Sequence, residues 1–339
     1  MIEIDGSYLE GGGQILRTAI SLSAITKKPC HIFNIRKKRK KPGLMKQHLY
    51  GLRALARLCQ AEVKGDFLES LEVWFWPGEI KATDLTVKIE TAGSITLVLQ
   101  TLILPALYSP SPVNIYFDGG ATDTFFSPTI DHFRYVFLKI LEKIGAKIDV
   151  NIIERGFYPE GGAKVKVKIF PAPLKSISLT KRGKLKKITI ISGASENLKK
   201  KRVAERQISG AKQILGKLKL PFQEKIEYYF TLGTGSQINI IGELENTVFG
   251  TDNLGKLGKS AETVGKEAAL DFLREIKSNA CLDKYLADQI LVFMALSPGK
   301  SEVTVSEITN HCKTNIWVIE KFLEGKFKIE GNKISWHPK

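Results

Sequence analysis

The chain has 339 residues, of which 43% are hydrophobic and 25% are charged. A chain of this length and composition buries a sizeable core, which excludes a collagen-like chain, a mini-protein and an intrinsically disordered protein. Its 51 basic and 35 acidic side chains leave a net charge of +16, and this charge favours a polyanionic partner.

The sequence also bears on where the protein acts. The longest apolar run, residues 95–107, is interrupted by polar side chains and by Pro105, so we predict no transmembrane helix and no membrane partner. The N-terminus lacks the basic and apolar segments of an export signal, which favours a cytoplasmic location. The 4 cysteines lack metal-ligand spacing and are interpreted as reduced core thiols, with one disulfide as the alternative for a chain this rich in Lys and Ile.

In chain order, the predicted elements begin with two helices that open on glycine-containing turns. Apolar residues at helical spacing follow Gly11–Gly13, and a second helical stripe follows Pro42-Gly43 and continues to Cys59. Apolar residues at three- and four-residue spacing predict further helices over residues 94–108, 129–144, 202–218, 259–277, 281–296 and 312–323.

Short alternating strands are predicted between these helices. The clearest covers residues 164–169, where every second residue is a lysine and the aliphatic residues between them face the core. Residues 327–336 predict a closing hairpin with Gly331-Asn332 at its tip. The fold class is therefore α+β, built from β/α groups. No dinucleotide-binding fingerprint of the Gly-x-Gly-x-x-Gly type is present, which disfavours a nicotinamide-dependent enzyme.

A motif that occurs twice and two changes in composition suggest how the chain is organised. The pattern Tyr-x-Glu-Gly-Gly occurs at residues 8–12 and again at residues 158–162, which indicates a repeated β/α unit. Composition shifts near residues 171–173 and 253–260. We therefore predict a main domain formed by residues 1–180 and 277–339, and an inserted α/β subdomain formed by residues 181–276.

Two basic clusters account for much of the positive charge. Residues 36–46 hold seven basic side chains and no acidic one, and residues 175–202 hold ten basic side chains and the single acid Glu196. Such runs form either solvated faces or binding surfaces for a polyanion.

A glycine-rich turn offers a place for phosphate. Gly11–Gly13 open a helix, and glycines at a helix N-terminus expose N–H groups where the helix dipole favours an anion; a tight turn without a ligand is the alternative. Glu10 stands beside this turn. A carboxylate next to phosphate points to a bridging divalent cation, and the alternative is an acid that stabilises the helix dipole.

Arginine placement favours phosphate recognition, since the planar guanidinium matches phosphate oxygens better than lysine does. Arg17 lies one helical turn after the glycines, and Arg36 and Arg39 lie in the first basic cluster, upstream of Gln47. His311 begins an amphipathic helix, and the dipole of that helix favours the neutral, nucleophilic imidazole. No Ser or Cys partner supports a hydrolytic triad. Direct attack on phosphorus by this histidine is one interpretation, and a structural or surface imidazole is the alternative.

Seven collinear blocks together resemble the RNA 3′-terminal phosphate cyclase family, in order from residue 2 to about residue 336. The inserted stretch 181–276 is the least anchored part of this resemblance. The blocks are Glu10-Gly-Gly-Gly-Gln-Ile-Leu-Arg17, Ile35-Arg36 with Arg39, Lys41-Pro-Gly-Leu44 with Gln47-His48, Thr91-Ala-Gly-Ser94 through Leu99-Gln100, Gly156-Phe-Tyr-Pro-Glu-Gly-Gly162, Tyr285-Leu-Ala-Asp-Gln289, and His311 with Thr314-Asn315.

The resemblance implies a fold and an activity. The fold would have three repeated β/α units similar to the C-terminal domain of a translation initiation factor, plus a smaller inserted α/β subdomain. The activity would use ATP to convert an RNA 3′-terminal phosphate to a 2′,3′-cyclic phosphodiester. A covalent histidine–AMP and an RNA-adenylate would be intermediates, and pyrophosphate and AMP would be released. The partner is then RNA with a 3′-phosphate; a homo-oligomer is compatible with the sequence.

The resemblance also assigns roles to individual residues. His311 would be the nucleophile, and Glu10 would hold Mg²⁺ or Mn²⁺ beside the ATP phosphates. Phosphates of ATP or of the RNA end would be bound by Arg17, Arg36, Arg39 and Gln47. The nucleotide would be contacted by Gln100, Pro128, Tyr285, Asp288 and Gln289, with Pro128 and Tyr285 on opposite faces of the adenine.

Two departures and two alternatives accompany this assignment. Leu9 replaces the glycine that commonly precedes the glutamate in this family, and Ala163 replaces the last glycine of the second Glu-Gly-Gly block; neither lies at the proposed chemistry. A non-catalytic RNA-binding ribosome-assembly relative of the same fold is the main alternative. An enolpyruvyl transferase is the other, but its small anionic substrate would not explain two basic clusters.

Overall fold

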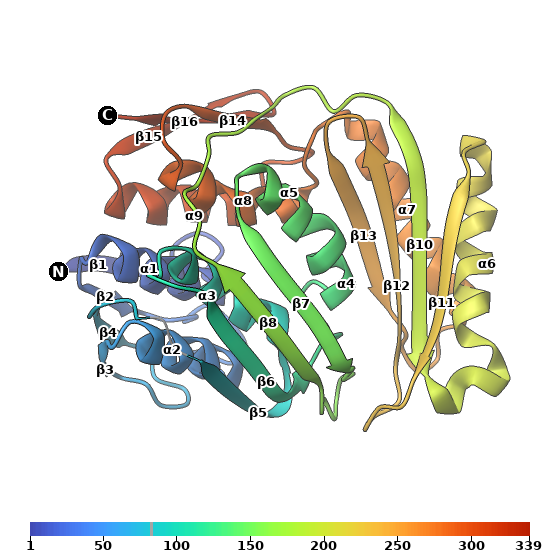
Figure 1. The fold of residues 1–339 in the computed structure, drawn as a ribbon, viewed down its shortest axis with the longest axis horizontal. Helices are drawn as coiled ribbons and strands as arrows, with labels where there is room; N and C mark the ends of the chain where they lie inside the picture. Colours follow the sequence, from blue (N-terminus) through green and yellow to red (C-terminus); the bar gives the residue numbers. More distant parts are fainter. Residues whose placement is uncertain (82–83) are drawn as a thin grey trace.

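In a computed structural model, which describes residues 1–81 and 84–339, the described chain forms four sheets of four strands with their helices (Figure 1). This mixed arrangement confirms the predicted α+β class. Each sheet contains one parallel pair of strands, which continues into antiparallel neighbours.

The first sheet holds the N-terminal quarter of the chain. Its order is β1-β2-β4-β3, and β1 and β2 run parallel. The strands are β1 (Ile2–Asp5), β2 (Cys30–Phe33), β3 (Glu62–Lys64) and β4 (Val73–Trp76), and the helices between them are α1 (Gly13–Thr26) and α2 (Lys46–Leu58).

The second sheet repeats that arrangement with the order β5-β6-β8-β7. Its strands are β5 (Leu85–Ser94), β6 (Val113–Ala121), β7 (Lys147–Glu154) and β8 (Lys164–Phe170). Its helices are α3 (Ile95–Leu107) and a continuous segment of α4 (Ile130–His132), a π-helical turn (Phe133–Phe137) and α5 (Leu138–Lys143). In β8 the aliphatic residues Val165, Val167 and Ile169 are buried while Lys166 and Lys168 are exposed, as the alternation predicts.

The third sheet has the corresponding order β9-β14-β16-β15, and again its first two strands run parallel. The strands are β9 (Ser178–Leu179), β14 (Ser301–Thr304), β15 (Gly325–Glu330) and β16 (Lys333–Pro338), and the helices are α8 (Lys284–Leu296) and α9 (Asn310–Phe322). β15 and β16 form the predicted closing hairpin, which turns at residues 331–332.

The fourth sheet has a different order, β11-β10-β12-β13. Its strands are β10 (Leu185–Ser195), β11 (Phe222–Tyr229), β12 (Ser236–Leu244) and β13 (Val248–Leu254). The 3₁₀ turns η2 (Glu196–Lys201) and η3 (Gly216–Leu218) flank α6 (Val203–Leu215), and α7 (Ala261–Ser278) follows the sheet. All of these elements lie in the chain between β9 and α8, and they surround a hydrophobic cluster separate from that of the other three sheets.

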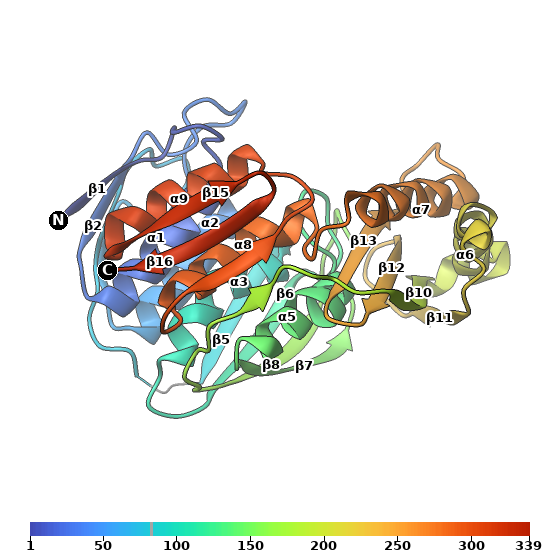
Figure 2. The same cartoon turned by 90° about the horizontal axis from the view of Figure 1, so that it is seen from above.

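The site is positioned by helices in the interior of the larger part of the molecule. Figure 2 shows α1, α3, α8 and α9 packed together, with the first three sheets around them and the unit of α6 and α7 at the far end. Helix α3 is buried along nearly its whole length, which explains why its sequence is apolar on every side. The N-termini of helices that belong to different sheets, such as α1 and α9, therefore meet between the sheets.

Several local expectations can now be compared with the fold. The predicted helices are present, with ends shifted by a few residues. The two Tyr-x-Glu-Gly-Gly patterns occupy different places, since the first precedes α1 and the second joins β7 to β8; this motif therefore does not mark equivalent positions of a repeat. All four cysteines are buried and unbridged. Among the described residues, no helix combines the length and apolarity needed to cross a membrane.

Candidate active site

His311 lies in the first turn of α9, beside the N-terminus of α1. The hydroxyl of Thr309 caps this helix by accepting from the Cys312 N–H at 3.2 Å. The side-chain amide of Gln14 donates to the His311 carbonyl at 2.7 Å, and its oxygen bonds Nδ1 of the imidazole. Because that oxygen can only accept, Nδ1 carries the proton and Nε2 keeps a free lone pair. Gln14 belongs to the first block of the resemblance, but the sequence analysis assigned it no role.

The electrostatic surroundings keep this imidazole neutral. Burial lowers the pKa of His311 below its ordinary value; Glu10 opposes this shift, and Arg39 and Arg17 add to it. Nε2 lies 3.6 Å from Oε1 of Glu10. The reactive nitrogen therefore faces the carboxylate and the arginines that the sequence placed at a phosphate site.

The glycine-rich turn brings backbone close to these side chains. Gly12 precedes the first turn of α1, and a Cβ there would lie 3.3 Å from Nη2 of Arg39 and 4.0 Å from Cε1 of His311. Glycine has no side chain with which to satisfy the first N–H groups of the helix. These groups therefore remain suited to an anion.

Gly13 is held against a buried histidine. A Cβ at Gly13 would lie 2.1 Å from Nε2 of His48, so any side chain there would overlap the imidazole. The Met45 N–H donates to Nδ1 of His48 at 3.0 Å. Burial, reinforced by Arg17 and Arg36, lowers the pKa of His48 to about 3, which keeps it neutral at physiological pH. His48 belongs to a block quoted for the resemblance, but the sequence gave it no role.

We expect Gly13→Ala to destabilise the protein by about 1–3 kcal/mol, the usual cost of overpacking. It should also slow any chemistry at His311, because either His48 or α1 must move. Equilibrium unfolding and a rate assay measure the two effects. Gly216→Ala is the matched control, since a Cβ there meets no atom within 4 Å. Equal behaviour of the two variants would contradict the steric role of Gly13.

Arg36 and Arg39, both in the first basic cluster, make different contacts. Arg39 donates from Nη2 to the Glu10 carbonyl at 3.0 Å and forms an ion pair with the Glu10 carboxylate. Arg36 donates from Nη1 to the carbonyls of Lys41 and Gly43, at 2.7 and 2.9 Å. Arg36 therefore braces the loop that presents Arg39 to the glycine-rich turn.

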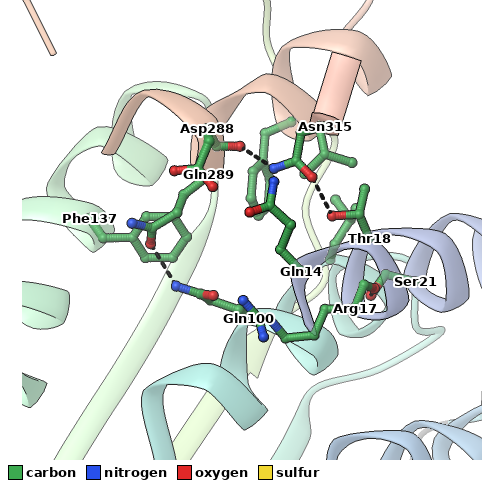
Figure 3. A pocket seen from close by; sticks show the side chains of 12 residues that line it. Gln14, Arg17, Thr18, Ser21, Gln100, Phe137, Asp288, Gln289 and Asn315 are labelled. Atoms are coloured by element: carbon green, nitrogen blue, oxygen red, sulfur yellow. Dashed lines mark hydrogen bonds between the residues drawn. The ribbon is translucent and has the colours of Figure 1, made fainter. Parts of the chain in front are cut away.

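A cavity adjoins this cluster where four helices meet (Figure 3). Gln100 of α3 donates to the Gln289 side chain at 2.7 Å, and Gln289 donates to the Tyr285 carbonyl at 2.7 Å. Asn315 of α9 donates to the Asp288 carbonyl at 2.8 Å and accepts from the Thr18 hydroxyl at 2.9 Å. The cavity lining includes Gln14, Arg17, Thr18, Ser21, Gln100, Leu104, Phe137, Asp288, Gln289, Val292, Phe293 and Asn315.

Arg17 and Asp288 place opposite charges on the cavity wall. Burial raises the pKa of Asp288 to about 7, and Arg17 opposes that shift. Burial likewise lowers the pKa of Arg17 to about 10, which leaves it charged at neutral pH. The charged guanidinium of Arg17, beside a carboxyl group whose pKa is close to 7, suits a polar, anionic ligand.

Besides His311, Glu10, Arg36 and Arg39, three more predicted residues lie outside this cavity lining. Tyr285 is 62% exposed at the start of α8. Gln47 lies beside Gly93, at the end of β5. The Pro128 carbonyl accepts from the Thr96 hydroxyl at 2.9 Å, one turn of α3 before Gln100. The predicted stacking of Pro128 and Tyr285 on a base stays a prediction.

Comparison with known proteins identifies the family of this chain. The family model described as RNA 3′-terminal phosphate cyclase matches residues 8–329. The chain belongs to the RNA 3′-terminal phosphate cyclase family. An RNA 3′-terminal phosphate cyclase of Pyrococcus abyssi is 46% identical over 332 residues, 98% of this chain and 96% of the relative. Proteins of the same name from Pyrobaculum aerophilum and Sulfurisphaera tokodaii are 45% and 44% identical, over 96% and 98% of this chain and 94% and 97% of their own lengths.

Membership in this cyclase family confirms the predicted resemblance and the prediction of an enzyme. The alternative of an enolpyruvyl transferase is therefore wrong. Leu9, where the family commonly has glycine, has a backbone φ of +42°, in the left-handed region that favours glycine. Ala163 has no such requirement; it is fully buried, and its N–H donates to the Gly120 carbonyl at 3.0 Å.

The metal that the cyclase family implies can be tested against the residues present. Within residues 1–81 and 84–339, no group of three or more His, Cys, Asp or Glu side chains is arranged to hold a metal ion. Glu10 thus supplies a single carboxylate. One carboxylate fits Mg²⁺ or Mn²⁺ when phosphate oxygens and water complete the coordination. The residues fit a cation that arrives with a phosphate ligand.

Proposed function

We propose that this protein converts an RNA 3′-terminal phosphate to a 2′,3′-cyclic phosphodiester at the expense of ATP. The observation that carries the proposal is the neutral Nε2 of His311, which faces Glu10 and Arg39 at the glycine-rich start of α1. The names of the curated relatives support the same reaction. ATP and RNA are the substrates, and Mg²⁺ or Mn²⁺ is the accompanying cation.

In the first step, Nε2 of His311 attacks the α-phosphorus of ATP. A P–N bond forms, and the P–O bond to pyrophosphate breaks. Gln14 holds the Nδ1 proton, and Glu10 stabilises the positive charge that develops on the ring. A cation held by Glu10 would neutralise charge on the leaving pyrophosphate. Arg17, Arg36, Arg39 and Gln47 bind the phosphates of ATP or of the RNA end.

In the second step, an oxygen of the RNA 3′-phosphate attacks the adenylate, and His311 leaves as a neutral imidazole. The vicinal 2′-OH then attacks the activated terminal phosphate, its proton is lost, and AMP departs. This cyclisation is intramolecular, so an effective molarity of roughly 10⁵ M or more is available from positioning alone. The nucleotide is bound by Gln100, Pro128, Tyr285, Asp288 and Gln289.

We also infer that the protein carries three repeated β-α-β-α-β-β units and one inserted subdomain at residues 181–276. The shared strand order and directions of the first three sheets support the repeat. The different order of the fourth sheet and its separate hydrophobic cluster support the insertion. The main domain then comprises residues 1–180 and 277–339.

The function is tested with an RNA that carries a labelled 3′-terminal phosphate. Incubation with ATP and Mg²⁺ or Mn²⁺ should make the label resistant to phosphatase, with AMP and pyrophosphate as products. A DNA strand with a 3′-phosphate should form no cyclic product, because it lacks the 2′-OH. RNA binding without conversion would overturn the proposal in favour of the non-catalytic RNA-binding relative.

Arg39→Lys should reduce the rate of protein adenylylation by about tenfold or more, although the charge is retained. Lysine cannot reproduce the two bonds that Arg39 makes to Glu10 while it also engages phosphate. Labelling with α-labelled ATP measures the rate. Lys40→Ala removes a charge from the same loop without removing a guanidinium and should have a smaller effect. Full activity of Arg39→Lys would refute recognition by the arginine fork.

Adenylylation should lose rate on the acid side, with a midpoint below pH 6.5. The pKa of His311 is lowered, so the imidazole stays neutral until the pH falls through that lowered value. Single-turnover labelling at saturating ATP from pH 5 to 8 gives the profile. Asp288→Asn removes the contribution of an acid whose pKa is about 7. A midpoint above 6.5 in that variant would contradict the neutral-imidazole assignment.

A further inference from the structure

We propose that an exposed aromatic platform formed by Phe125, Phe126, Tyr158 and Phe230 binds the bases of the single-stranded RNA that leads to the reacting 3′ end. The proposal rests on the proposed function for its substrate and extends it to a second RNA-binding surface. Phe126 and Phe230 are 103% and 87% exposed, although large apolar side chains normally avoid water.

Three connections bring these side chains to one place. Phe125 lies between β6 and α4, and its ring meets that of Tyr158, from the β7–β8 connection, edge to face at 5.7 Å. Phe230 lies between β11 and β12, two residues before Leu232, whose side chain would lie 3.1 Å from a Cβ at Gly162. Figure 1 shows the β7–β8 and β11–β12 connections at the same end of their sheets.

The most exposed ring belongs to Phe126, whose backbone conformation is unfavourable. Phe126 has a φ of +64°, a left-handed conformation that bulky side chains rarely adopt. Packing does not account for it, since the ring is fully exposed. A strained residue that places an apolar ring in water points to a ligand for that ring.

The platform is continuous with the candidate active site. Phe126 lies two residues before Pro128, whose carbonyl bonds Thr96 one turn before Gln100. On the other side, a Cβ at Gly161 would lie 3.1 Å from Ala92, and one at Gly93 would lie 3.9 Å from the side chain of Gln47. The platform therefore adjoins the loop that carries Pro128 and the end of β5 near Gln47, two residues predicted to bind the nucleotide and the phosphates.

The charge beside the platform selects a polyanion. Asn197 donates to the Thr234 hydroxyl at 2.6 Å, which joins η2 to the β11–β12 connection. Lys199, Lys200, Lys201 and Arg202 follow, and all four are exposed. Two acidic side chains also lie near this surface: Glu196 forms an ion pair with Lys199, and Glu160 lies close to Gly233. A second copy of this chain would bring a matching run of cations to the same surface, whereas RNA brings phosphates.

Aromatic rings beside cations are the usual means of holding single-stranded nucleic acid without reading its sequence, because every base has a stacking face. Removing one stacking ring from such sites weakens binding by about 5- to 100-fold. The platform should therefore favour single-stranded RNA ends over paired ones, with little dependence on sequence.

The experiment compares Phe126→Ala and Phe230→Ala with the wild type. Fluorescence anisotropy measures binding of an RNA of about twelve nucleotides with a 3′-phosphate, a length within the range that such surfaces hold. We expect the Kd, and the KM for cyclisation of this RNA, to rise about fivefold or more in each variant. The KM for a dinucleotide 3′-phosphate and the labelling by ATP alone should not change.

Further variants separate stacking from other effects. Phe126→Trp should retain binding and Phe126→Leu should lose it, because leucine keeps the apolar surface but not the ring. Tyr108→Ala, at the opposite end of α3, removes a 43% exposed ring from elsewhere and should change nothing. Lys200→Gln should lower the slope of log affinity against log salt by about 0.7.

Unchanged binding in both alanine variants, or a change only in oligomeric state by sedimentation, would overturn the platform. The latter result would make it a contact between copies of the chain. The two proposals fail separately: RNA binding that depends on the platform without cyclisation by the wild type would refute the enzymatic function alone. Cyclisation that is indifferent to both rings would refute the platform alone.

Discussion

Replacing His311 by alanine should abolish transfer of label from α-labelled ATP to the protein and, with it, cyclisation of RNA. The variant lacks the nitrogen that is proposed to form the P–N bond, so we expect a loss of about 1,000-fold or more. The label in the wild type should be sensitive to acid and stable to alkali, as expected for a phosphoramidate. Labelling and RNA cyclisation are measured on the same preparations.

His337→Ala is the matched control. His337 lies on β16, its side chain is bonded to Ser335, and it is exposed, so its removal should leave labelling unchanged. Labelled protein from His311→Ala would show that another side chain is the nucleophile. A wild-type protein that cyclises RNA but is never labelled would show that no covalent intermediate forms.

Arg155→Ala should destabilise the protein by about 3–5 kcal/mol, the largest stability effect that we predict. Arg155 is 4% exposed, lies 2.6 Å from Asp131 and 3.2 Å from Asp123, and stacks on Tyr229 with 4.6 Å between its guanidinium carbon and the ring centroid. The variant leaves the buried carboxylate of Asp123 without its cation, and it leaves Asp131 with only the longer ion pair to Arg134, at 3.8 Å. Denaturant unfolding at equilibrium measures the loss.

The deficit of Arg155→Ala should shrink as the pH falls. Burial already raises the pKa of Asp123 to about 6, although Arg155 opposes that shift, and loss of Arg155 raises the pKa further. A carboxyl with a raised pKa binds a proton more readily when folded, so stability is regained as the pH falls through that value toward about 4. Arg274→Ala breaks an exposed ion pair and should cost less than about 1 kcal/mol. Equal losses in the two variants would mean that the buried cluster is solvated.

The same region links the fourth sheet to the candidate nucleotide site. The Thr129 N–H donates to Asp252 of β13 at 2.7 Å, and its hydroxyl donates to Asn239 of β12 at 2.7 Å. Thr129 follows Pro128 and caps α4. The fourth sheet therefore holds the loop that carries Pro128 and two residues of the aromatic platform, Phe125 and Phe126.

Local sequence patterns predicted much of the secondary structure. The alternation of β8 and the turn of the β15–β16 hairpin depend on neighbours in the chain, so they are visible in a short stretch of sequence. The apolar stripes of α1 and α2 are equally local. The resemblance to the cyclase family, which seven collinear blocks carry, predicts the roles of His311, Glu10 and the arginines.

Residues whose roles depend on contacts across the chain were not predicted. Gln14 is 297 positions from His311, and although it lies in a block of the resemblance, its spacing does not indicate a contact with that histidine. His48 is defined by its contact with Gly13, and Arg155 by the carboxylates of Asp123, in the β6–α4 connection, and Asp131, in α4. The spacing of residues along the sequence predicts a contact only when both residues lie on the same helix or strand.

The sequence by itself determined the element types, because these depend on local periodicity, and the family, because its motifs are collinear blocks of sequence. It also predicts which residues carry phosphoryl chemistry, and these roles stay predictions. Only the tertiary structure decided which nitrogen of His311 is free, that Arg36 braces a loop while Arg39 meets Glu10, and that the rings of Phe125 and Tyr158 meet where the β11–β12 connection packs against the β7–β8 connection. Those outcomes follow from how helices and loops distant in the chain pack together, and packing of that kind leaves no periodic signal in the sequence.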